Sequence, residues 1–112
     1  MFIVCIISHD DDYKPNPSEI DYIQLYETRE EAEESINKCR CRHINDYAEE
    51  HEITMKNLPK KYKKNFQKRD CSVDVKPEFI NNTSILKEII DNLLSFEYIN
   101  SEYDYYIYER NI

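Results

Sequence analysis

The chain has 112 residues, is 40% hydrophobic and 34% charged, and carries a formal net charge of −8 at pH 7. This length allows one domain with a modest core, and the ten Tyr and four Phe exclude a disordered acidic tail. Glycine is absent, which excludes a P-loop, a Gly-x-Gly dinucleotide turn, a kinase glycine-rich loop and a Gly-x-Ser-x-Gly nucleophile elbow. Left-handed turns must therefore be made by Asn or Asp, and ten Asn are available.

The four Cys are interpreted as free thiols in a reducing compartment, because nothing in the sequence points to export. Residues 1–7 have no basic residue, are too short to span a membrane, and are typical of a strand. We therefore expect a cytoplasmic, intracellular protein with no membrane contact. The bias toward Ile, Asn, Lys, Tyr and Phe indicates an A+T-rich coding sequence, which is compatible with a viral or phage component of the virion or host cell.

Two strands are expected before the first helix. Residues 2–8 are apolar on both faces, as in a strand that is covered on both sides or central in its sheet. Residues 10–18 are rich in turn-forming residues and predict a surface loop. Residues 20–27 predict a second strand with one face toward the core. One face of this strand carries Ile23 and Leu25, and the other carries Tyr22, Gln24 and Tyr26.

A long amphipathic helix is predicted from Thr28 to about Glu52. Thr28-Arg29-Glu30-Glu31 has the form of a capping box, in which the Thr28 hydroxyl accepts a hydrogen bond from the Glu31 N–H. Buried positions then recur at helical spacing and form one face. These positions are Ala32, Ile36, Cys39, His43 and Tyr47, widened by Ile44 and Ala48.

A basic segment follows at residues 53–69, with seven basic residues and no acidic one. The rest of the chain is strongly acidic, so an acidic body carries one basic segment. Leu58, Tyr62 and Phe66 are spaced four apart, and Pro59 suits the first turn of a helix. The pattern predicts a short helix over residues 59–68.

The last third of the chain is predicted as a connector, a third helix and a strand. Residues 70–80 form the connector, in which 73–75 are a short extended piece, and residues 81–84 offer N-caps for the helix. The tail, residues 96–110, is rich in Tyr and suits a strand with a break near 100–102. The helix carries the most apolar stripe of the chain: Ile85, Leu86, Ile89, Ile90, Leu93 and Leu94.

The predicted order is strand, strand, helix, helix, helix, strand in a single domain over residues 1–112. An α+β fold satisfies this order, with a small antiparallel or mixed sheet of about three strands and helices on one face. The first strand is expected in the middle, with the Tyr-rich strand beside it.

Several short motifs resemble a layout found in small uncharacterised proteins of bacteria, phages and large DNA viruses. The motifs are His9-Asp10-Asp11-Asp12 after the first strand, Leu25-Tyr26-Glu27, Thr28-x-Glu30-Glu31-Ala32-Glu33, and the late Tyr-Ile-Tyr strand. The resemblance implies no activity.

The cluster Cys39-Arg40-Cys41-Arg42-His43 contains candidate zinc ligands. On a helix, Cys39 and His43 share a face while Cys41 points roughly opposite, and no second pair completes the site. We favour a buried thiol and a hydrogen-bonded core histidine, and we expect no metal and no cofactor. We interpret His9 and the three Asp after it as a charged loop, so no catalytic residue is assigned and no enzyme is expected.

The basic segment offers candidate phosphate ligands, with Tyr62 and Phe66 as candidate stacking groups. The net charge of −8 opposes the approach of a polyanion. We therefore favour a solvated surface that complements acidic protein over a nucleic-acid site. The candidate basic patch is Lys60, Lys61, Lys63, Lys64, Lys68 and Arg69.

The Tyr-rich tail is the candidate protein interface, because Tyr is enriched at interfaces and an edge strand is protected by pairing with a second copy. The candidate residues are Tyr98, Tyr103, Tyr105, Tyr106 and Tyr108. We predict a non-enzymatic protein-interaction, structural or accessory protein that binds a protein partner or itself as a homodimer. The alternative is a nucleic-acid-associated accessory protein that uses residues 56–69.

Overall fold

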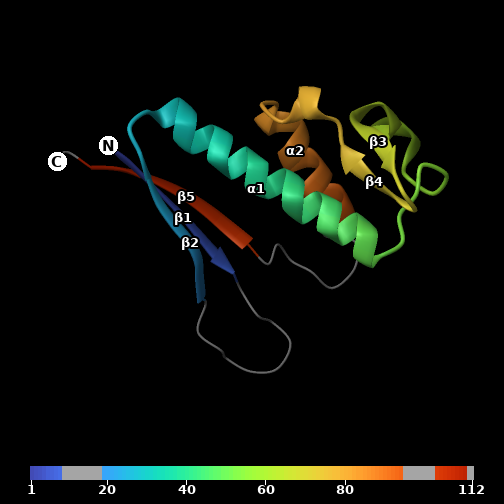
Figure 1. Ribbon diagram of the computed structural model, residues 1–112, viewed down its shortest axis with the longest axis horizontal. Coiled ribbons are helices and arrows are strands. Elements are labelled where there is room, and N and C mark those ends of the chain that lie inside the picture. Colours follow the sequence, from blue (N-terminus) through green and yellow to red (C-terminus); the bar gives the residue numbers. More distant parts are fainter. Residues whose placement is uncertain (9–18, 95–102, 111–112) are drawn as a thin grey trace.

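The computed structural model of the chain describes residues 1–8, 19–94 and 103–110. Its elements are β1 (Phe2–Ser8), β2 (Glu19–Tyr26), α1 (Arg29–Glu50), β3 (Phe66–Arg69), β4 (Ser72–Val75), α2 (Thr83–Ile89) and β5 (Tyr103–Glu109). Short 3-10 turns at Lys60–Asn65 and Pro77–Phe79 and a π-turn at Ile90–Leu94 join them. Helices and small antiparallel sheets confirm the α+β class (Figure 1).

Sheet A has the strand order β2-β1-β5, and both pairings are antiparallel. The predictions that the first strand is central and that the Tyr-rich strand lies beside it are confirmed. The pairing of β1 with β5 continues one residue beyond the strands, since the Met1 and Arg110 backbones exchange hydrogen bonds of 2.8 and 3.0 Å. The predicted loop at residues 10–18 lies wholly outside the described residues, as does the start of the tail.

The helix α1 begins where the capping sequence predicts, since Thr28 is its N-cap and the Thr28 hydroxyl accepts from the Glu31 N–H at 3.1 Å. Its buried face differs from the prediction, because two stripes are buried and not one. The first stripe is Ala32, Ile36 and Cys39; the second is Asn37, Cys41, Ile44 and Ala48. At about 100° per residue, the two stripes lie roughly 140° apart around the helix. Cys41 is therefore buried although it points away from Cys39.

The first stripe packs on sheet A. Val4 and Ile6 of β1 form a core with Ala32, Ile36 and Cys39 of α1. At the edge of this core the Tyr26 hydroxyl donates to Ser35 Oγ at 2.7 Å. One face of sheet A is thus closed by the N-terminal half of α1.

The second stripe packs on β3, β4 and α2, which lie along the C-terminal half of α1 (Figure 1). The fully buried side chains of this second core include Tyr62, Phe66, Val73, Leu86 and Ile89. Asn37 joins α1 to α2 through a 2.9 Å hydrogen bond from its amide to Thr83 Oγ1. One helix therefore takes part in both cores.

The prediction of a helix over residues 59–68 is wrong. A 3-10 helix at Lys60–Asn65 is followed by β3, because Phe66 has an extended backbone with φ −119° and ψ 155°. Tyr62 and Phe66 are still buried, so the apolar spacing reports packing on the second core and not helical geometry. The extended piece predicted at 73–75 is confirmed as part of β4, which pairs with β3. Pairing with β4 across the two-residue turn at Asp70 and Cys71, and not helical spacing, makes Phe66–Arg69 a strand.

Two left-handed positions occur among the described residues, at Asp70 (φ 48°) and Glu52 (φ 54°). Asp70 fits the expectation that Asn or Asp replaces Gly, and it lies in the turn between β3 and β4. Glu52 does not fit it, and it follows the C-cap of α1, where Gly is the usual residue. Because the chain has no glycine, Glu52 makes this turn, although its Cβ makes a positive φ energetically unfavourable.

The third predicted helix begins as expected but is short. Asn82 is its N-cap and accepts from the Ile85 N–H at 3.1 Å. The α-helical part ends at Ile89 and one π-turn follows. Leu86 and Ile89 are fully buried, as the stripe predicted. Within the described ranges, no helix has the length and apolar character needed to cross a membrane.

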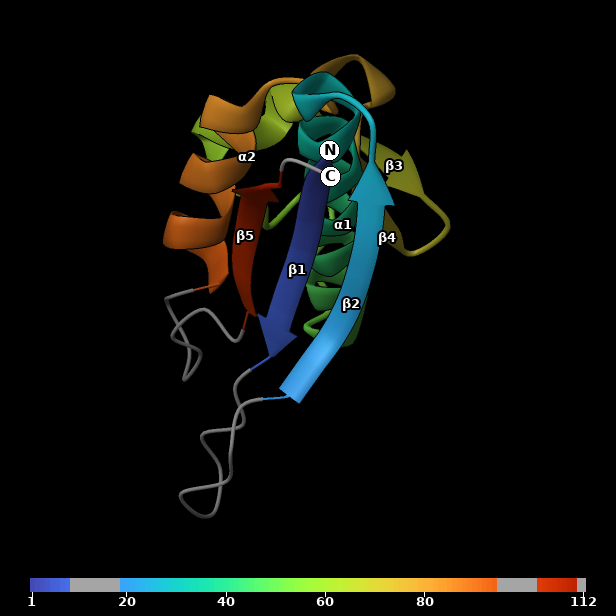
Figure 2. The same cartoon turned by 90° about the vertical axis from the view of Figure 1, so that its left-hand side faces the viewer.

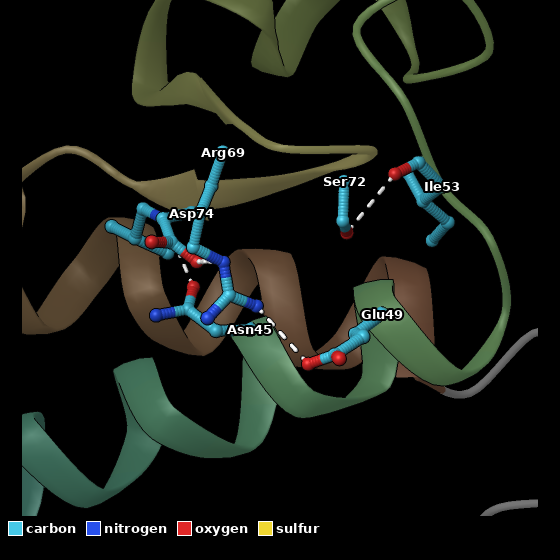
Figure 3. Close-up of polar contacts among 7 residues, drawn as sticks. Asn45, Glu49, Ile53, Arg69, Ser72 and Asp74 are labelled. Carbon is cyan, nitrogen blue, oxygen red and sulfur yellow. Dashed lines mark hydrogen bonds and ion pairs between the residues drawn. The ribbon is translucent and has the colours of Figure 1, made fainter.

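Polar contacts attach the β3–β4 hairpin to α1 and to the segment that follows α1 (Figure 3). Arg69 lies 3.2 Å from a Glu49 carboxylate oxygen of α1 and 3.0 Å from Asp74 of β4. The Asn45 side chain accepts from the Val75 N–H at 2.9 Å, and the Ser72 hydroxyl donates to the Ile53 carbonyl at 3.2 Å. Arg69 of the candidate basic patch is thus occupied within the fold.

Because α1 is shared, we expect damage to either core to destabilise the whole chain. Ile36→Ala and Ile44→Ala should each lower the free energy of unfolding by about 2–4 kcal/mol, since each leaves a cavity. Urea denaturation followed by far-UV circular dichroism and by tyrosine fluorescence should give one coincident transition for both variants. The exposed Asp46→Ala is the control. Two separate transitions in either variant would show that the cores unfold independently.

Candidate protein-interaction surface

The candidate tyrosines do not form one surface, because alternate residues of β5 point to opposite faces of sheet A. Tyr105 faces α1, whereas Tyr106 and Tyr108 face away from it and stack with ring centroids 6.0 Å apart. Tyr103 begins β5 opposite Ser8 of β1. Tyr98 lies outside the described residues.

Tyr105 is a structural link between β5 and α1. Its hydroxyl lies 2.6 Å from His43 Nδ1, and the Arg40 guanidinium lies 4.8 Å from its ring centroid. Burial lowers the pKa of Arg40, and the nearby Tyr105 and Glu33 oppose this shift. The guanidinium stays charged at neutral pH. These contacts assign Tyr105 to the interior, so two of the five candidate tyrosines remain as described surface residues.

Two rows on the face of sheet A that points away from α1 are apolar across all three strands. Cα pairing places Ile3 beside Leu25 and Tyr108. The next row on this face, two residues along each strand, pairs Cys5 with Ile23 and Tyr106. We call these six residues the outer face: Ile3, Cys5, Ile23, Leu25, Tyr106 and Tyr108.

The outer face is open in the described part of the chain, where α1 lies behind the sheet (Figure 2). Ile23 is 58% exposed, Leu25 and Tyr108 are each 51% exposed, and Tyr106 is 38% exposed. Cys5 is only 8% exposed because larger side chains flank it on both neighbouring strands. An antiparallel sheet with one solvated face usually alternates apolar and polar residues. Apolar side chains on both faces indicate a binding surface.

The contrast between the Ile23 and Leu25 face and the amphipathic face of Tyr22, Gln24 and Tyr26 predicts the wrong side of the second strand for the core. The pairing places Ile23 and Leu25 on the outer face, whereas Tyr26 faces α1. The sequence does contain evidence for an apolar outer face, since residues 2–8 are apolar on both faces. Only one face of β1 is covered by α1, so its other apolar residues lie on the outer face.

Within the described part of the chain, Cys39 and His43 contact different groups, Arg42 and Tyr105. Cys39 is buried in the first core, where Arg42 Nη2 lies 3.7 Å from its sulfur. Burial raises the pKa of the Cys39 thiol, and Arg42 opposes this shift. Among residues 1–8, 19–94 and 103–110, no group of three or more His, Cys, Asp or Glu side chains could hold a metal ion.

The basic segment lies at the end of α1 far from sheet A (Figure 1). Lys60, Lys61, Lys63 and Lys64 are exposed on the 3-10 helix, and Lys68 is exposed on β3. Tyr62 and Phe66 are each 1% exposed in the second core. The exposed lysines of the segment can therefore bind a phosphate. Tyr62 and Phe66 are buried, so their rings are not available to stack on bases.

A pocket of about 420 Å³ lies beside this segment and includes Cys71, Lys56 and Lys68 in its lining. Cys71 is exposed, as a nucleophile must be. The described lining residues contain no histidine that would act as its base: Thr54, Met55, Lys56, Lys68, Asp70, Cys71 and Ser72. A Cys–His arrangement is thus missing from this pocket.

No protein-family model, curated protein or solved structure matches this chain. The resemblance to small viral and bacterial proteins stays a prediction, and His9-Asp10-Asp11-Asp12, one of its motifs, lies outside the described residues.

The burial of the cysteines predicts their reactivity. Cys71 is exposed, whereas Cys5, Cys39 and Cys41 are buried, and burial raises the pKa of Cys41 to about 11. We expect one thiol to react quickly with a maleimide at neutral pH and all four to react in denaturant, because thiolate and access both limit the rate. Mass spectrometry counts the adducts, and Cys71→Ser should remove the fast phase. Rapid labelling of Cys39 in the folded protein would contradict this picture.

Proposed function

We propose that this chain is a non-enzymatic association protein that forms a homodimer through the outer face of sheet A. The observation that carries the proposal is the apolar outer face, in which six neighbouring positions on three strands are Ile, Leu, Tyr or Cys. Covering a half-exposed Ile or Leu side chain contributes on the order of 1 kcal/mol. Solvent exposure of this face is therefore a cost that association removes.

The size of the face sets the expected strength of association. Three strands about 4.8 Å apart and about seven residues long present roughly 300 Å² of projected area. Over both copies this is roughly 600 Å², which is below the standard specific interface and in the range of weak, transient contacts. We therefore expect a reversible dimer in the micromolar range, with monomer at lower concentrations.

Electrostatics permits this contact despite the net charge of −8. Repulsion between two copies acts mainly between their solvated surfaces and is screened beyond about 8 Å at physiological ionic strength. The six residues of the outer face are uncharged. No charge in this set would have to be desolvated on contact.

The proposal is tested by charging each face of β2 in turn. Leu25→Arg puts a cation in the outer face and should abolish the dimer, because burying an unpaired charge is costly. Gln24→Arg is the matched control, since the exposed Gln24 is the adjacent residue and points to the opposite face. It should dimerise like the unmodified chain. Sedimentation velocity over a micromolar concentration series measures both.

The proposal fails if the unmodified chain stays monomeric through the upper micromolar range. It also fails if Leu25→Arg dimerises as well as Gln24→Arg. In that case the contact lies elsewhere, such as the free edge of β5. Circular dichroism confirms that both variants are folded.

Nucleic-acid binding is the second candidate, favoured by the four exposed lysines of the 3-10 helix, for which no ion pair occurs within the described part of the chain. Changing Lys60, Lys61, Lys63 and Lys64 to Glu should abolish any binding of a single-stranded oligonucleotide at low salt. Fluorescence anisotropy measures this, with the exposed Lys87→Glu as control. We leave Arg69 unchanged because it pairs with Glu49 and Asp74. Absence of binding by the unmodified chain at low salt would end this candidate.

A further inference from the structure

One end of the outer face carries opposite charges on its two edge strands. Glu27 is the first residue after β2, and we assign it to the outer face by extending the strand alternation from Leu25 one residue beyond Tyr26. Arg110 follows β5 on the same face as Tyr108, since its backbone is still paired with Met1. Both residues are exposed, and neither has an ion-pair partner within the described part of the chain.

We infer that the two copies of the proposed dimer pack outer face to outer face about a two-fold axis parallel to the strands, so that Glu27 of each copy pairs with Arg110 of the other. This inference rests on the proposed function and adds the orientation of the second copy and the residues that select it.

A two-fold axis that runs along the strands between two facing sheets exchanges their edges, so β2 of one copy lies over β5 of the other. Positions along the strands are preserved. When the register is extended by one residue beyond Phe2↔Tyr26, Glu27 falls in the row of Met1 and Arg110, whose backbones are hydrogen-bonded. Each Glu27 therefore faces the partner's Arg110, and the contact occurs twice because the interface is isologous.

The same operation matches the apolar residues. The row Leu25, Ile3, Tyr108 of one copy faces the same row of the second copy in the opposite order. Each Leu25 therefore lies over a Tyr108 of the second copy. Likewise each Ile23 lies over a Tyr106. Large rings thus cover aliphatic side chains, which gives the interlocking contacts of aligned sheets packed about 10 Å apart.

The other in-plane two-fold axis does not give this match. An axis perpendicular to the strands places β2 over β2 and reverses the strand ends. Glu27 and Arg110 would then lie far from the partner's Glu27 and Arg110, and both charges would stay unpaired. Charge complementarity therefore selects the axis parallel to the strands.

The test is a charge exchange between two variants. In the Glu27→Arg homodimer each of the two contacts between positions 27 and 110 becomes an arginine–arginine pair. In the Arg110→Glu homodimer each becomes a glutamate–glutamate pair. Each change should raise the dimer dissociation constant by roughly tenfold, as expected for two ion pairs at an interface rim turned into like-charge pairs. A mixture of the two variants restores both opposite-charge pairs, so the mixed dimer should bind like the unmodified chain.

Native mass spectrometry resolves the three dimers because the variants differ in mass. We expect the mixed dimer to exceed both homodimers, and its excess to shrink at high salt because the pairs are solvated. Glu78→Arg is the control, since the exposed Glu78 changes the net charge equally but lies outside sheet A. It should leave dimerisation unchanged.

The outcomes separate the orientation from the proposed function. If Leu25→Arg abolishes the dimer but the mixed dimer shows no excess, the outer face is the interface and the parallel two-fold axis is wrong. If Glu78→Arg weakens dimerisation as much as Glu27→Arg, the effect is one of net charge and the inference is also wrong. A chain that never dimerises overturns the proposed function together with the inference.

Discussion

The burial of α1 on two sides is the constraint on which the rest of the structure depends. Its two stripes lie about 140° apart, so one helix closes sheet A with its first half and the hairpin and α2 with its second half. Hydrogen bonds from Asn37 to Thr83 and from Val75 to Asn45 hold the second contact in place. A short chain without glycine thus obtains two small cores from one long element.

Because α1 packs on two cores, it covers only one face of sheet A. The N-terminal half of α1 covers one face of three strands, and the second half is occupied elsewhere (Figure 2). In the described residues the apolar side chains on the other face of β1 are covered only by their neighbours on β2 and β5. Ile23 and Leu25 lie there at more than half exposure, where a solvated sheet would carry polar residues. The described surface therefore includes an open sheet face with two apolar rows, which supports the proposed association.

The sequence predicts the helix N-caps correctly, because capping depends on residues that are close together in the chain. Thr28 caps α1 and Asn82 caps α2, since a side-chain oxygen three residues before a free N–H is a property of the sequence itself. The central place of β1 followed from its apolar character on both faces. The strand at Phe66–Arg69 was not predictable, because it depends on pairing with Ser72–Val75 and its side chains mimic helical spacing.

The sequence by itself determined the α+β class, the exclusion of glycine-dependent phosphate sites, the start of α1 and the separation of an acidic body from a basic segment. Only the tertiary structure decided which tyrosines are surface and which are interior. Tyr105 and Tyr106 are neighbours of one residue type, yet one bonds to His43 and the other lies on the outer face. Strand alternation separates such residues, but the choice of side depends on where α1 packs, which is a non-local contact.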